Sequence, residues 1–297
     1  MKDPTGVELP PWTPGAHIDI CLPSGLIRQY SLCGDPADRT SYRVAVLREE
    51  AGRGGSAELH SLATAGGSLR VRGPRNHFEL EETQPYVFIA GGIGITPILS
   101  MAASMPPDAD WQLHYAGRSR STMALLDEAL ALGAERVRIY PRDEGQRLDL
   151  DGILAGIDPT AAIYACGPPG LLKELELCRD ARAPGVALHT ERFVPSEEPR
   201  QVPPDESDDT SFEVELVRSN LTLRVPIGRS VLSVIRDAVP GVPFSCEEGY
   251  CGSCETRVVE GIPDHRDEIL TEDEREASKT MMTCVSRSCT PRLVLDL

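Results

Sequence analysis

The first part of the chain alternates apolar and polar residues over short segments. These segments are separated by Gly and Pro residues and lie at His17–Leu22, Ile27–Leu32, Tyr42–Arg48 and Ser68–Arg72. Alternation with a period of two is typical of strands that bury one face. We therefore predict a small antiparallel β-barrel over residues 1–83.

From residue 84 the pattern changes, because apolar strand-like runs now alternate with helical runs. The strand-like runs are Tyr86–Ala90, Trp111–Ala116, Arg136–Tyr140 and Ala161–Ala165. The helical runs are Pro97–Ser104, Met123–Leu132 and Leu171–Arg179. Alternation of this kind predicts a parallel sheet covered by helices, and so an α/β domain over residues 84–193.

One stretch within this part, Tyr86–Met105, is twenty residues long and carries no charge. By length alone it is a candidate membrane span. Gly91, Gly92, Gly94 and Pro97 interrupt it, however. A buried strand, a glycine turn and a buried helix therefore explain it better than the alternative of a membrane span.

Residues 194–210 have the composition of a linker, with four prolines, six acidic residues and no apolar periodicity. Proline and repelling charges keep such a segment extended. Residues 211–297 follow as a further domain. It is predicted to contain a hairpin, a helix and a short second helix, at Phe212–Val217 with Leu221–Val225, Ser230–Ala238 and Thr271–Ala277.

The chain is acidic, with a formal net charge of −16, and residues 205–297 alone hold 19 acidic and 10 basic side chains. This balance gives no electrostatic basis for binding nucleic acid. Met1–Gly15 has four prolines and no apolar core, so we expect no export signal and a cytoplasmic protein. The nine cysteines then favour metal or redox chemistry over disulfides.

Four of these cysteines have a characteristic spacing. Cys246, Cys251 and Cys254 follow a C-x4-C-x2-C pattern, and Cys284 lies beyond twenty-nine intervening residues. This is the spacing of the plant-type 2Fe–2S cluster, whose two irons need four thiolates on a compact loop. We predict these four residues as the cluster ligands.

A structural zinc site is the alternative, although zinc usually takes paired C-x2-C sequences and only one is present. Gly249 and Gly252 lie between the predicted ligands and give the loop the freedom to bend around the inorganic sulfides. Cys289 is a competing fourth ligand; it precedes a closing strand, and we expect it in the core or at an edge.

A glycine turn joins the first strand of the α/β domain to its first helix. Gly91, Gly92 and Gly94 form the turn, Thr96 is placed to cap the helix, and Pro97 lies in its first turn. A helix N-terminus beneath close-approach glycines suits a pyrophosphate. The alternative is a simple packing corner, and the spacing is not that of the G-x-G-x-x-G fingerprint.

A second turn, Cys166-Gly167-Pro168, follows a later strand of the same sheet. Ligands of open α/β sheets collect at the carboxyl ends of the strands. In isolation Cys166 is better explained as a buried core residue. Together, however, the two turns resemble the nucleotide module of the ferredoxin–NADP⁺ reductase superfamily. The resemblance implies that Cys166 lies beside the nicotinamide and that Arg118 and Arg120 approach the adenosine end.

Arg28, Gln29, Tyr30 and Ser31 resemble the R-x-Y-S flavin motif of that superfamily. A guanidinium matches a phosphate and an aromatic face covers a ring system, although an ordinary half-buried strand is the alternative. Backbone N–H groups of Gly54 and Gly55 and the hydroxyl of Ser56 are suited to the same phosphate.

The full order of motifs resembles the phthalate dioxygenase reductase family, which includes the reductases of vanillate demethylases. The likeness covers residues 9–297 and adds Val46, Leu47, Arg48 and Phe193, the last packing near the flavin in that family. It implies three parts: an antiparallel flavin-binding β-barrel, an α/β parallel-sheet NAD-binding domain and a C-terminal β-grasp ferredoxin domain. The family's barrel begins with a further strand upstream of Pro11–Gly15, and this chain lacks it.

The resemblance implies a reductase that passes electrons from NADH through FMN and the 2Fe–2S cluster to a terminal Rieske-type oxygenase, an aromatic-ring dioxygenase or O-demethylase. FAD and NADPH are the alternatives for the first two cofactors. A haem-thiolate monooxygenase is the alternative acceptor, and an iron–sulfur redox sensor without turnover is the alternative from another class.

Overall fold

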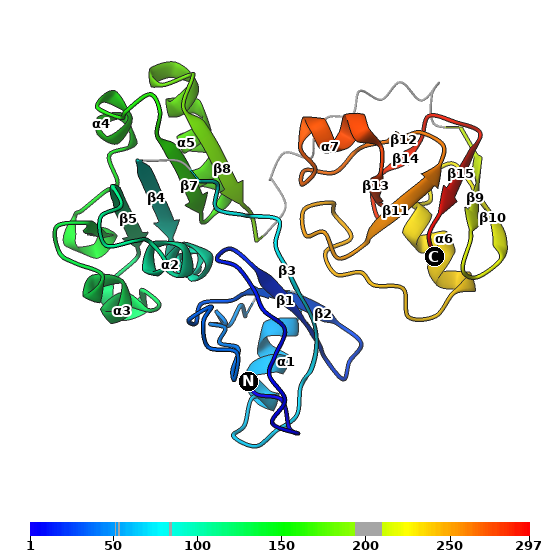
Figure 1. Ribbon diagram of the computed structural model, residues 1–297, viewed down its shortest axis with the longest axis horizontal. Helices are drawn as coiled ribbons and strands as arrows, with labels where there is room; N and C mark the ends of the chain where they lie inside the picture. The colour runs from blue at the N-terminus through cyan, green and yellow to red at the C-terminus, as the bar shows by residue number, and fades with distance from the viewer. Residues whose placement is uncertain (51, 53, 83–84, 194–209) are drawn as a thin grey trace. The chain divides into compact units, whose positions relative to one another are not determined.

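The computed structural model describes residues 1–50, 52, 54–82, 85–193 and 210–297. The chain forms two compact units, Met1–Val194 and Pro195–Leu297 (Figure 1). The predicted linker at 194–210 lies, except for Thr210, outside the described residues, as does residue 84.

Unit 1 begins with a three-stranded antiparallel sheet in the order β2-β1-β3. Its elements, with the helix that precedes β3, are β1 (His17–Cys21), β2 (Ile27–Ser31), α1 (Gly55–Leu62) and β3 (Arg70–Arg75). Ile18 and Ile20 of β1 are fully buried in its core, and Ile18 pairs with Tyr30 across the sheet. The alternation seen in the sequence therefore places one face of these strands inward, as predicted.

The predicted strand at Tyr42–Arg48 was wrong, because only an isolated bridge between Leu32 and Val44 forms there. Alternation predicts which face is buried, but a strand also needs a neighbour to complete its hydrogen-bonded ladder. The last predicted strand, Ser68–Arg72, lies instead at β3.

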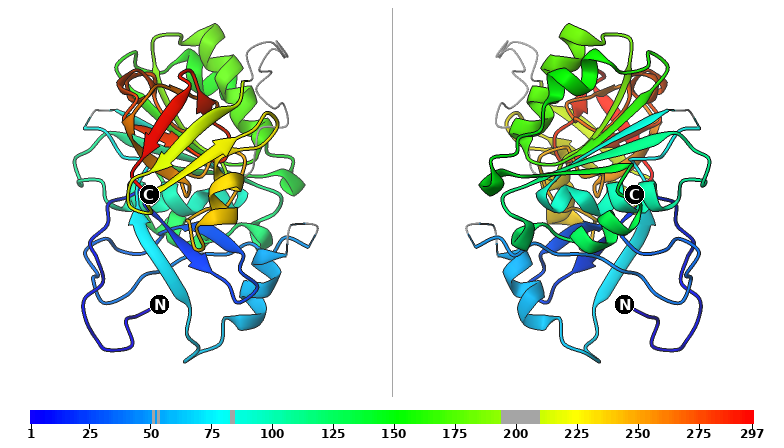
Figure 2. Two further views of the ribbon diagram at one scale, coloured as in Figure 1. Left: turned by 90° about the vertical axis from the view of Figure 1, so that its right-hand side faces the viewer. Right: turned by 90° about the vertical axis from the view of Figure 1, so that its left-hand side faces the viewer.

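The second part of unit 1 is a five-stranded parallel sheet in the order β6-β5-β4-β7-β8, drawn in teal and green in Figures 1 and 2. Its strands are β4 (Tyr86–Gly91), β5 (Trp111–Gly117), β6 (Val137–Pro141), β7 (Ala162–Cys166) and β8 (Ala187–Glu191). The α-helices are α2 (Ile95–Ala103), α3 (Leu126–Ala131), α4 (Leu150–Ala155) and α5 (Pro169–Arg182), with 3-10 turns η1 (Gly92–Gly94), η2 (Arg120–Thr122) and η3 (Arg142–Glu144). Separate apolar cores fill its two faces.

The predicted cap by Thr96 was wrong. β4 runs directly into the 3-10 turn η1, so α2 begins at Ile95 and Thr96 lies inside it. The Thr96 hydroxyl donates to the carbonyl of Ile93 at 3.0 Å. Pro97 lies in the first turn of α2, as predicted.

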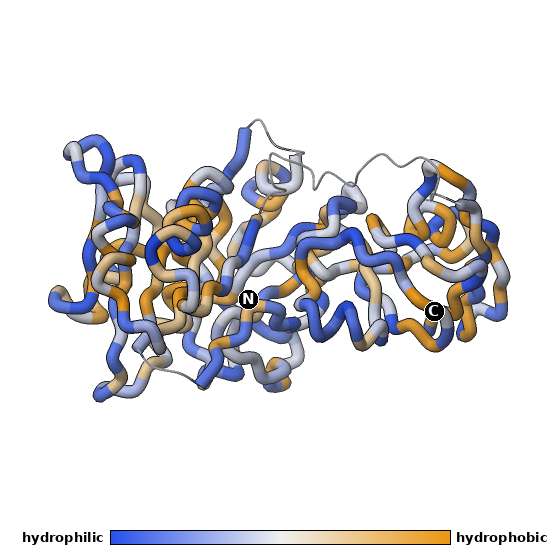
Figure 3. Tube along the Cα trace, turned by 90° about the horizontal axis from the view of Figure 1, so that it is seen from above, coloured by the Kyte–Doolittle hydropathy of each residue, from blue (hydrophilic) through white to orange (hydrophobic). Residues whose placement is uncertain are grey.

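Unit 2 is built on a five-stranded mixed sheet in the order β10-β9-β15-β11-β13, in which β9 and β15 are parallel. Its strands are β9 (Phe212–Leu216), β10 (Leu221–Val225), β11 (Glu255–Glu260), β12 (Pro263–Asp264), β13 (Thr280–Met282), β14 (Arg287–Ser288) and β15 (Arg292–Leu295), and its helices are α6 (Val231–Ala238) and α7 (Glu272–Ala277). Figure 3 shows hydrophobic stretches alternating with hydrophilic ones along both units.

The predicted three-part architecture is confirmed, with an antiparallel sheet, a parallel α/β sheet and a separate C-terminal mixed sheet. Over the part of the chain that the structure describes, no helix combines the length and the apolar character that crossing a bilayer requires. The uncharged stretch at Tyr86–Met105 forms the predicted buried strand, glycine turn and helix.

We expect Gly94→Ala to destabilise unit 1 by about 1–3 kcal/mol, because overpacking strains a filled site. A Cβ at Gly94 would overlap the Cys166 carbonyl oxygen and lie 2.8 Å from the Gly167 nitrogen. Urea unfolding followed by tryptophan fluorescence measures this directly, since Trp12 and Trp111 both lie in unit 1.

Gly170→Ala is the matched control, because Gly170 lies in α5 with no atom within 4 Å of an added Cβ. The free energy of unfolding of the Gly170→Ala variant should stay unchanged or rise by up to about 1 kcal/mol, because alanine has a higher helix propensity than glycine. Equal effects of the two substitutions would contradict the steric argument.

Candidate functional site

The predicted cluster ligands come from two segments of unit 2. Cys246, Cys251 and Cys254 lie on the loop between α6 and β11, and Cys284 lies on the turn after β13. All four side chains are buried. The hydroxyl of Thr283 donates to the Cys254 carbonyl at 3.1 Å and so ties the two segments together.

The four sulfurs form one connected set. Hydrogen bonds from the thiols of Cys251 and Cys284 hold the pKa of Cys246 well below its usual value. The same contact with Cys246 raises the pKa of Cys251, and contacts with Cys246 and Cys254 raise that of Cys284. Backbone N–H groups also point at sulfur, from Glu248 to Cys246 at 3.3 Å and from Cys246 to Cys251 at 3.4 Å. Converging thiols surrounded by N–H donors fit the needs of an iron–sulfur cluster.

Among the described residues, no three His, Cys, Asp or Glu side chains are arranged around one metal ion. A plant-type cluster does not need that arrangement, because its four thiolates are shared between two irons.

The shape of the cluster loop depends on residues with positive φ. Glu247, Gly249 and Gly252 have φ values of 62°, 78° and 70°. A Cβ on Gly249 would lie 2.7 Å from Cγ2 of Val285, the residue after Cys284. The loop packs against the Cys284 turn only because this position is glycine.

Cys289 lies apart from this set. It is exposed and its thiol contacts the Pro263 carbonyl at 3.8 Å. The expected edge position is therefore correct and the alternative core position is wrong.

In unit 1 the two predicted nucleotide turns touch each other. β4 and β7 are neighbours, so the glycine turn and the Cys166 turn emerge side by side at the same edge. A Cβ on Gly91 would lie 2.7 Å from Pro168 and 3.3 Å from the Cα of Gly167. The two turns are therefore closely packed against each other at this edge.

Beside these turns the structure brings Ser31, Cys166 and Glu191 together. Glu191 ends β8 and pairs in register with Cys166 on β7. The Ser31 hydroxyl donates to the Glu191 carboxylate at 3.4 Å, across 160 positions of the sequence. Burial raises the pKa of Glu191 to about 8, and it raises that of the Cys166 thiol far above its usual value. A neutral thiol and a carboxyl able to hold a proton therefore lie beside a strand-end serine.

Glu191 was not among the predicted site residues, although its place at the carboxyl end of a strand was a usable signal. Phe193 follows two residues later and is 37 % exposed.

The predicted flavin residues lie around the start of α1. Arg28 lies on β2, and its Nε would be 2.5 Å from a Cβ on Gly55. Gly54 has a φ of 81° and forms the N-cap of α1. The guanidinium and the helix N-terminus are thus adjacent, an arrangement suited to a phosphate. Burial raises the pKa of Tyr30, which is half-buried two residues along the strand.

Other predicted flavin residues have partners within the protein. The Gln29 amide lies 3.2 Å from Nε2 of His17. The Ser56 hydroxyl accepts from the Glu49 N–H at 3.0 Å, and the Val46 carbonyl lies 2.9 Å from a ring nitrogen of His60. Leu47 and Arg48 are exposed on the same segment.

The predicted adenosine residues follow β5, next to the glycine turn of β4. Arg120 forms an ion pair with Glu144, with Nε 2.6 Å from the carboxylate. The Arg118 carbonyl accepts from the Asp143 N–H at 3.0 Å. Residues after β5 and β6 are therefore joined at this edge, and the acidic partner was not predicted.

Comparison with known proteins identifies both units. The sequence profile of the 2Fe-2S iron-sulfur cluster binding domain matches residues 214–289. The chain is 44 % identical to phenoxybenzoate dioxygenase subunit beta of Ectopseudomonas oleovorans, over all of this chain and 91 % of that protein. It is 36 % identical to the structure of phthalate dioxygenase reductase, covering 100 % of this chain and 91 % of that one with a TM-score of 0.65. The chain belongs to the phthalate dioxygenase reductase family. It is an oxidoreductase of the reductase class, as predicted.

A further match sets this membership in context. An intact type IV self-sufficient cytochrome P450 monooxygenase is 46 % identical over the whole of this chain, with a TM-score of 0.87. This chain spans 38 % of that protein. Members of the phthalate dioxygenase reductase fold thus occur as separate subunits and as parts of longer chains.

We expect Cys284→Ser to lose most of its iron and of the visible absorption of the cluster, because a hydroxyl is a poor substitute for a thiolate ligand. Cys289→Ser is the matched control, and its iron content and spectrum should equal those of the unmodified chain. Anaerobic purification, iron and sulfide analysis and visible spectroscopy measure both. Loss of the cluster from the Cys289 variant alone would contradict the assignment.

The raised pKa of Glu191 predicts a pH-dependent stability. In the folded chain Glu191 keeps its proton up to about pH 8, whereas in the unfolded chain a carboxyl of ordinary pKa 4.5 releases its proton at lower pH. The native state therefore loses stability as the pH rises between these values. Since Glu191 is only half-buried, we expect a loss of about 1–2 kcal/mol rather than the full value of the shift.

Glu191→Gln removes the titrating group and should flatten this dependence. Urea unfolding of unit 1 at pH 5 and pH 8, followed by tryptophan fluorescence, measures the difference. Glu135→Gln, at an exposed position, should leave the slope unchanged. A Glu191 variant with the slope of the unmodified chain would show that this carboxyl titrates normally.

Proposed function

We propose that this chain takes a hydride from NADH onto bound FMN and passes single electrons through a 2Fe–2S cluster to a terminal Rieske-type oxygenase. Residues 1–83 form the flavin domain, residues 84–193 the NAD domain and residues 211–297 the ferredoxin domain, with 194–210 as the linker. The observation that carries the proposal is the adjacency of Ser31, Cys166 and Glu191 at one strand edge of unit 1, in a chain whose other unit gathers four cysteines.

A bound flavin supplies the conversion between two-electron and one-electron transfer. The chain supplies the positioning. An added Cβ at Gly92 would meet no atom within 4 Å, so the backbone of this turn is open to a nucleotide, and the buried, neutral Cys166 thiol is the proposed apolar contact for the nicotinamide. Glu191 holds a proton beside the Ser31 hydroxyl.

NADH is supported over NADPH by the ion pair at the adenosine edge. Glu144 engages both Nε and Nη2 of Arg120, at 2.6 and 3.3 Å. A 2′-phosphate would have to displace this carboxylate and would meet its negative charge. A ribose with a free 2′-hydroxyl meets no such repulsion.

FMN is supported over FAD by family membership, and Arg28 beside the start of α1 suits its phosphate. Arg48 and Phe193 are both exposed and are the proposed contacts to the rest of the flavin. Val46 and Leu47 contribute backbone to the same site.

A haem-thiolate monooxygenase is the second candidate acceptor. The specific observation in its favour is the 46 % identity to a self-sufficient cytochrome P450, slightly above the 44 % identity to the dioxygenase subunit. Electron acceptance in either case needs a docking partner. The acidic unit 2 would steer toward a basic surface.

The proposal predicts that NADH, and not NADPH at the same concentration, bleaches the flavin and cluster bands of the reconstituted chain. Stopped-flow spectroscopy measures the rates, and mass spectrometry of the released flavin distinguishes FMN from FAD. Coupled turnover is then measured with a Rieske oxygenase and with a cytochrome P450 haem domain supplied separately.

Faster coupled turnover with the Rieske component supports the proposal, whereas faster turnover with the P450 domain supports the second candidate. A sample that holds its cluster but is not bleached by either nucleotide would contradict both and favour the redox-sensor alternative. Soluble artificial acceptors serve as the control for internal electron transfer.

A further inference from the structure

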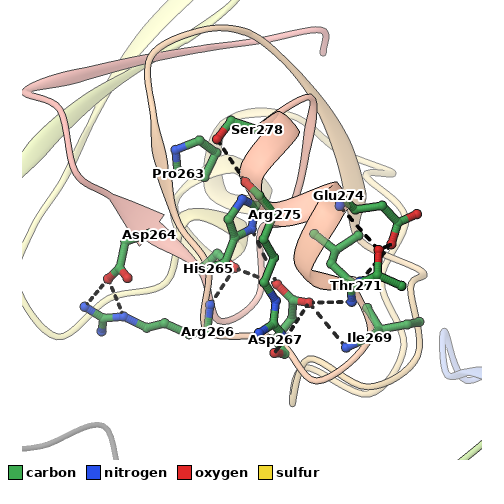
Figure 4. A network of polar contacts seen from close by, with 12 residues as sticks. Pro263, Asp264, His265, Arg266, Asp267, Ile269, Thr271, Glu274, Arg275 and Ser278 are labelled. Atoms are coloured by element: carbon green, nitrogen blue, oxygen red, sulfur yellow. Dashed lines mark hydrogen bonds and ion pairs between the residues drawn. The ribbon is translucent and has the colours of Figure 1, made fainter. Parts of the chain in front are cut away.

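A buried polar network lies behind the cluster loop of unit 2, and nothing in the proposed electron path uses it (Figure 4). Its centre is Asp267, whose side chain has no exposed surface. A buried carboxylate is costly unless it is hydrogen-bonded or paired with charge. The residues around Asp267 therefore have to compensate the cost of burying its carboxylate.

Asp267 organises the backbone that follows it. Its Oδ2 atom accepts from the N–H groups of Leu270 at 2.9 Å and Ile269 at 3.3 Å. Arg275 of α7 donates to the Asp267 carbonyl at 2.7 Å and places a cation 4.0 Å from Oδ2. His265 lies 3.7 Å from Oδ1 through Nδ1 and is itself buried. The carboxylate thus lies between an arginine, an imidazole and two backbone donors.

The same segment joins the two parts of the cluster site. The Glu268 N–H donates to the Gly249 carbonyl at 3.0 Å, in the loop that carries Cys246 and Cys251. The Ser286 hydroxyl, two residues beyond Cys284, lies 3.4 Å from Oδ1 of Asp267. A Cβ on Gly249 would lie 3.1 Å from the Asp267 Cα, so the packing is close.

We propose that Asp267 is a positioning residue of the cluster site, and that its buried negative charge lowers the reduction potential of the cluster. The carboxylate holds the segment that ties the Gly249 loop to the Cys284 turn. Adding an electron near a fixed negative charge in a weakly screened interior is unfavourable. Arg275 opposes this effect from the other side of the carboxylate. The proposal rests on the four cysteines holding the cluster.

The test is an EPR-monitored potentiometric titration of the full chain and its variants. The iron content and EPR signal of the unmodified chain first establish the cluster itself, separately from the role of Asp267. Asp267→Asn keeps an oxygen acceptor for the Ile269 and Leu270 N–H groups but removes the charge. We expect this variant to have a higher reduction potential, by an amount that corresponds to at least a threefold change in the equilibrium constant for adding one electron to the cluster.

Asp264→Asn is the matched control, because it makes the same charge change three residues away. Its carboxylate is partly exposed and pairs with Arg266 at 2.6 Å. For this control we expect less than a twofold change in the same one-electron equilibrium constant. Equal shifts in the two variants, or no shift in Asp267→Asn, would overturn the proposal.

Arg275→Gln provides an independent arm, since it removes the opposing cation. Its potential should move down, opposite in sign to that of Asp267→Asn. If Asp267→Asn loses its cluster, this supports the positioning role of Asp267. The direction in which the reduction potential of Arg275→Gln moves then decides whether the charge of Asp267 also acts on the cluster. An upward or absent shift in Arg275→Gln would then overturn it.

Discussion

The nucleotide edge of unit 1 depends on direct backbone contact between two turns. Gly94 lies so close to the Cys166 carbonyl, and Gly91 to Gly167, that no side chain fits between them. This contact exists because β4 and β7 are adjacent in a parallel sheet, where all strands end at the same edge. Every proposed nucleotide contact is positioned from that edge.

Polar contacts join the two parts of unit 1, but they differ in kind. Arg43 donates two hydrogen bonds to the Glu128 carboxylate, and both side chains are nearly half exposed. Exposed pairs contribute about 0–1 kcal/mol, so this one directs orientation more than it adds stability. The hydrogen bond between Ser31 and Glu191 joins the last residue of β2 to the last residue of β8.

Much of the fold and the grouping of the cysteines could be predicted from the sequence because most of these signals are local. The spacing of Cys246, Cys251 and Cys254 lies within nine residues, and the turn at Gly91–Gly94 interrupts one apolar run. Strand periodicity also placed Ile18 and Ile20 in the core.

The residues that prediction missed depend on contacts between distant segments. Glu191 acquires its role from Ser31, and Glu144 from Arg120, through pairings that no spacing rule records. Asp267 was missed for the same reason, since its carboxylate matters only through the loops it meets. The failed strand at Tyr42–Arg48 shows the converse, a local pattern without a partner.

The burial of Cys166 has a consequence for durability. Oxidants attack thiolates, and a thiol whose pKa is raised this far stays protonated at physiological pH. Reduced flavins that meet oxygen release peroxide, and a buried, protonated Cys166 thiol resists this oxidant.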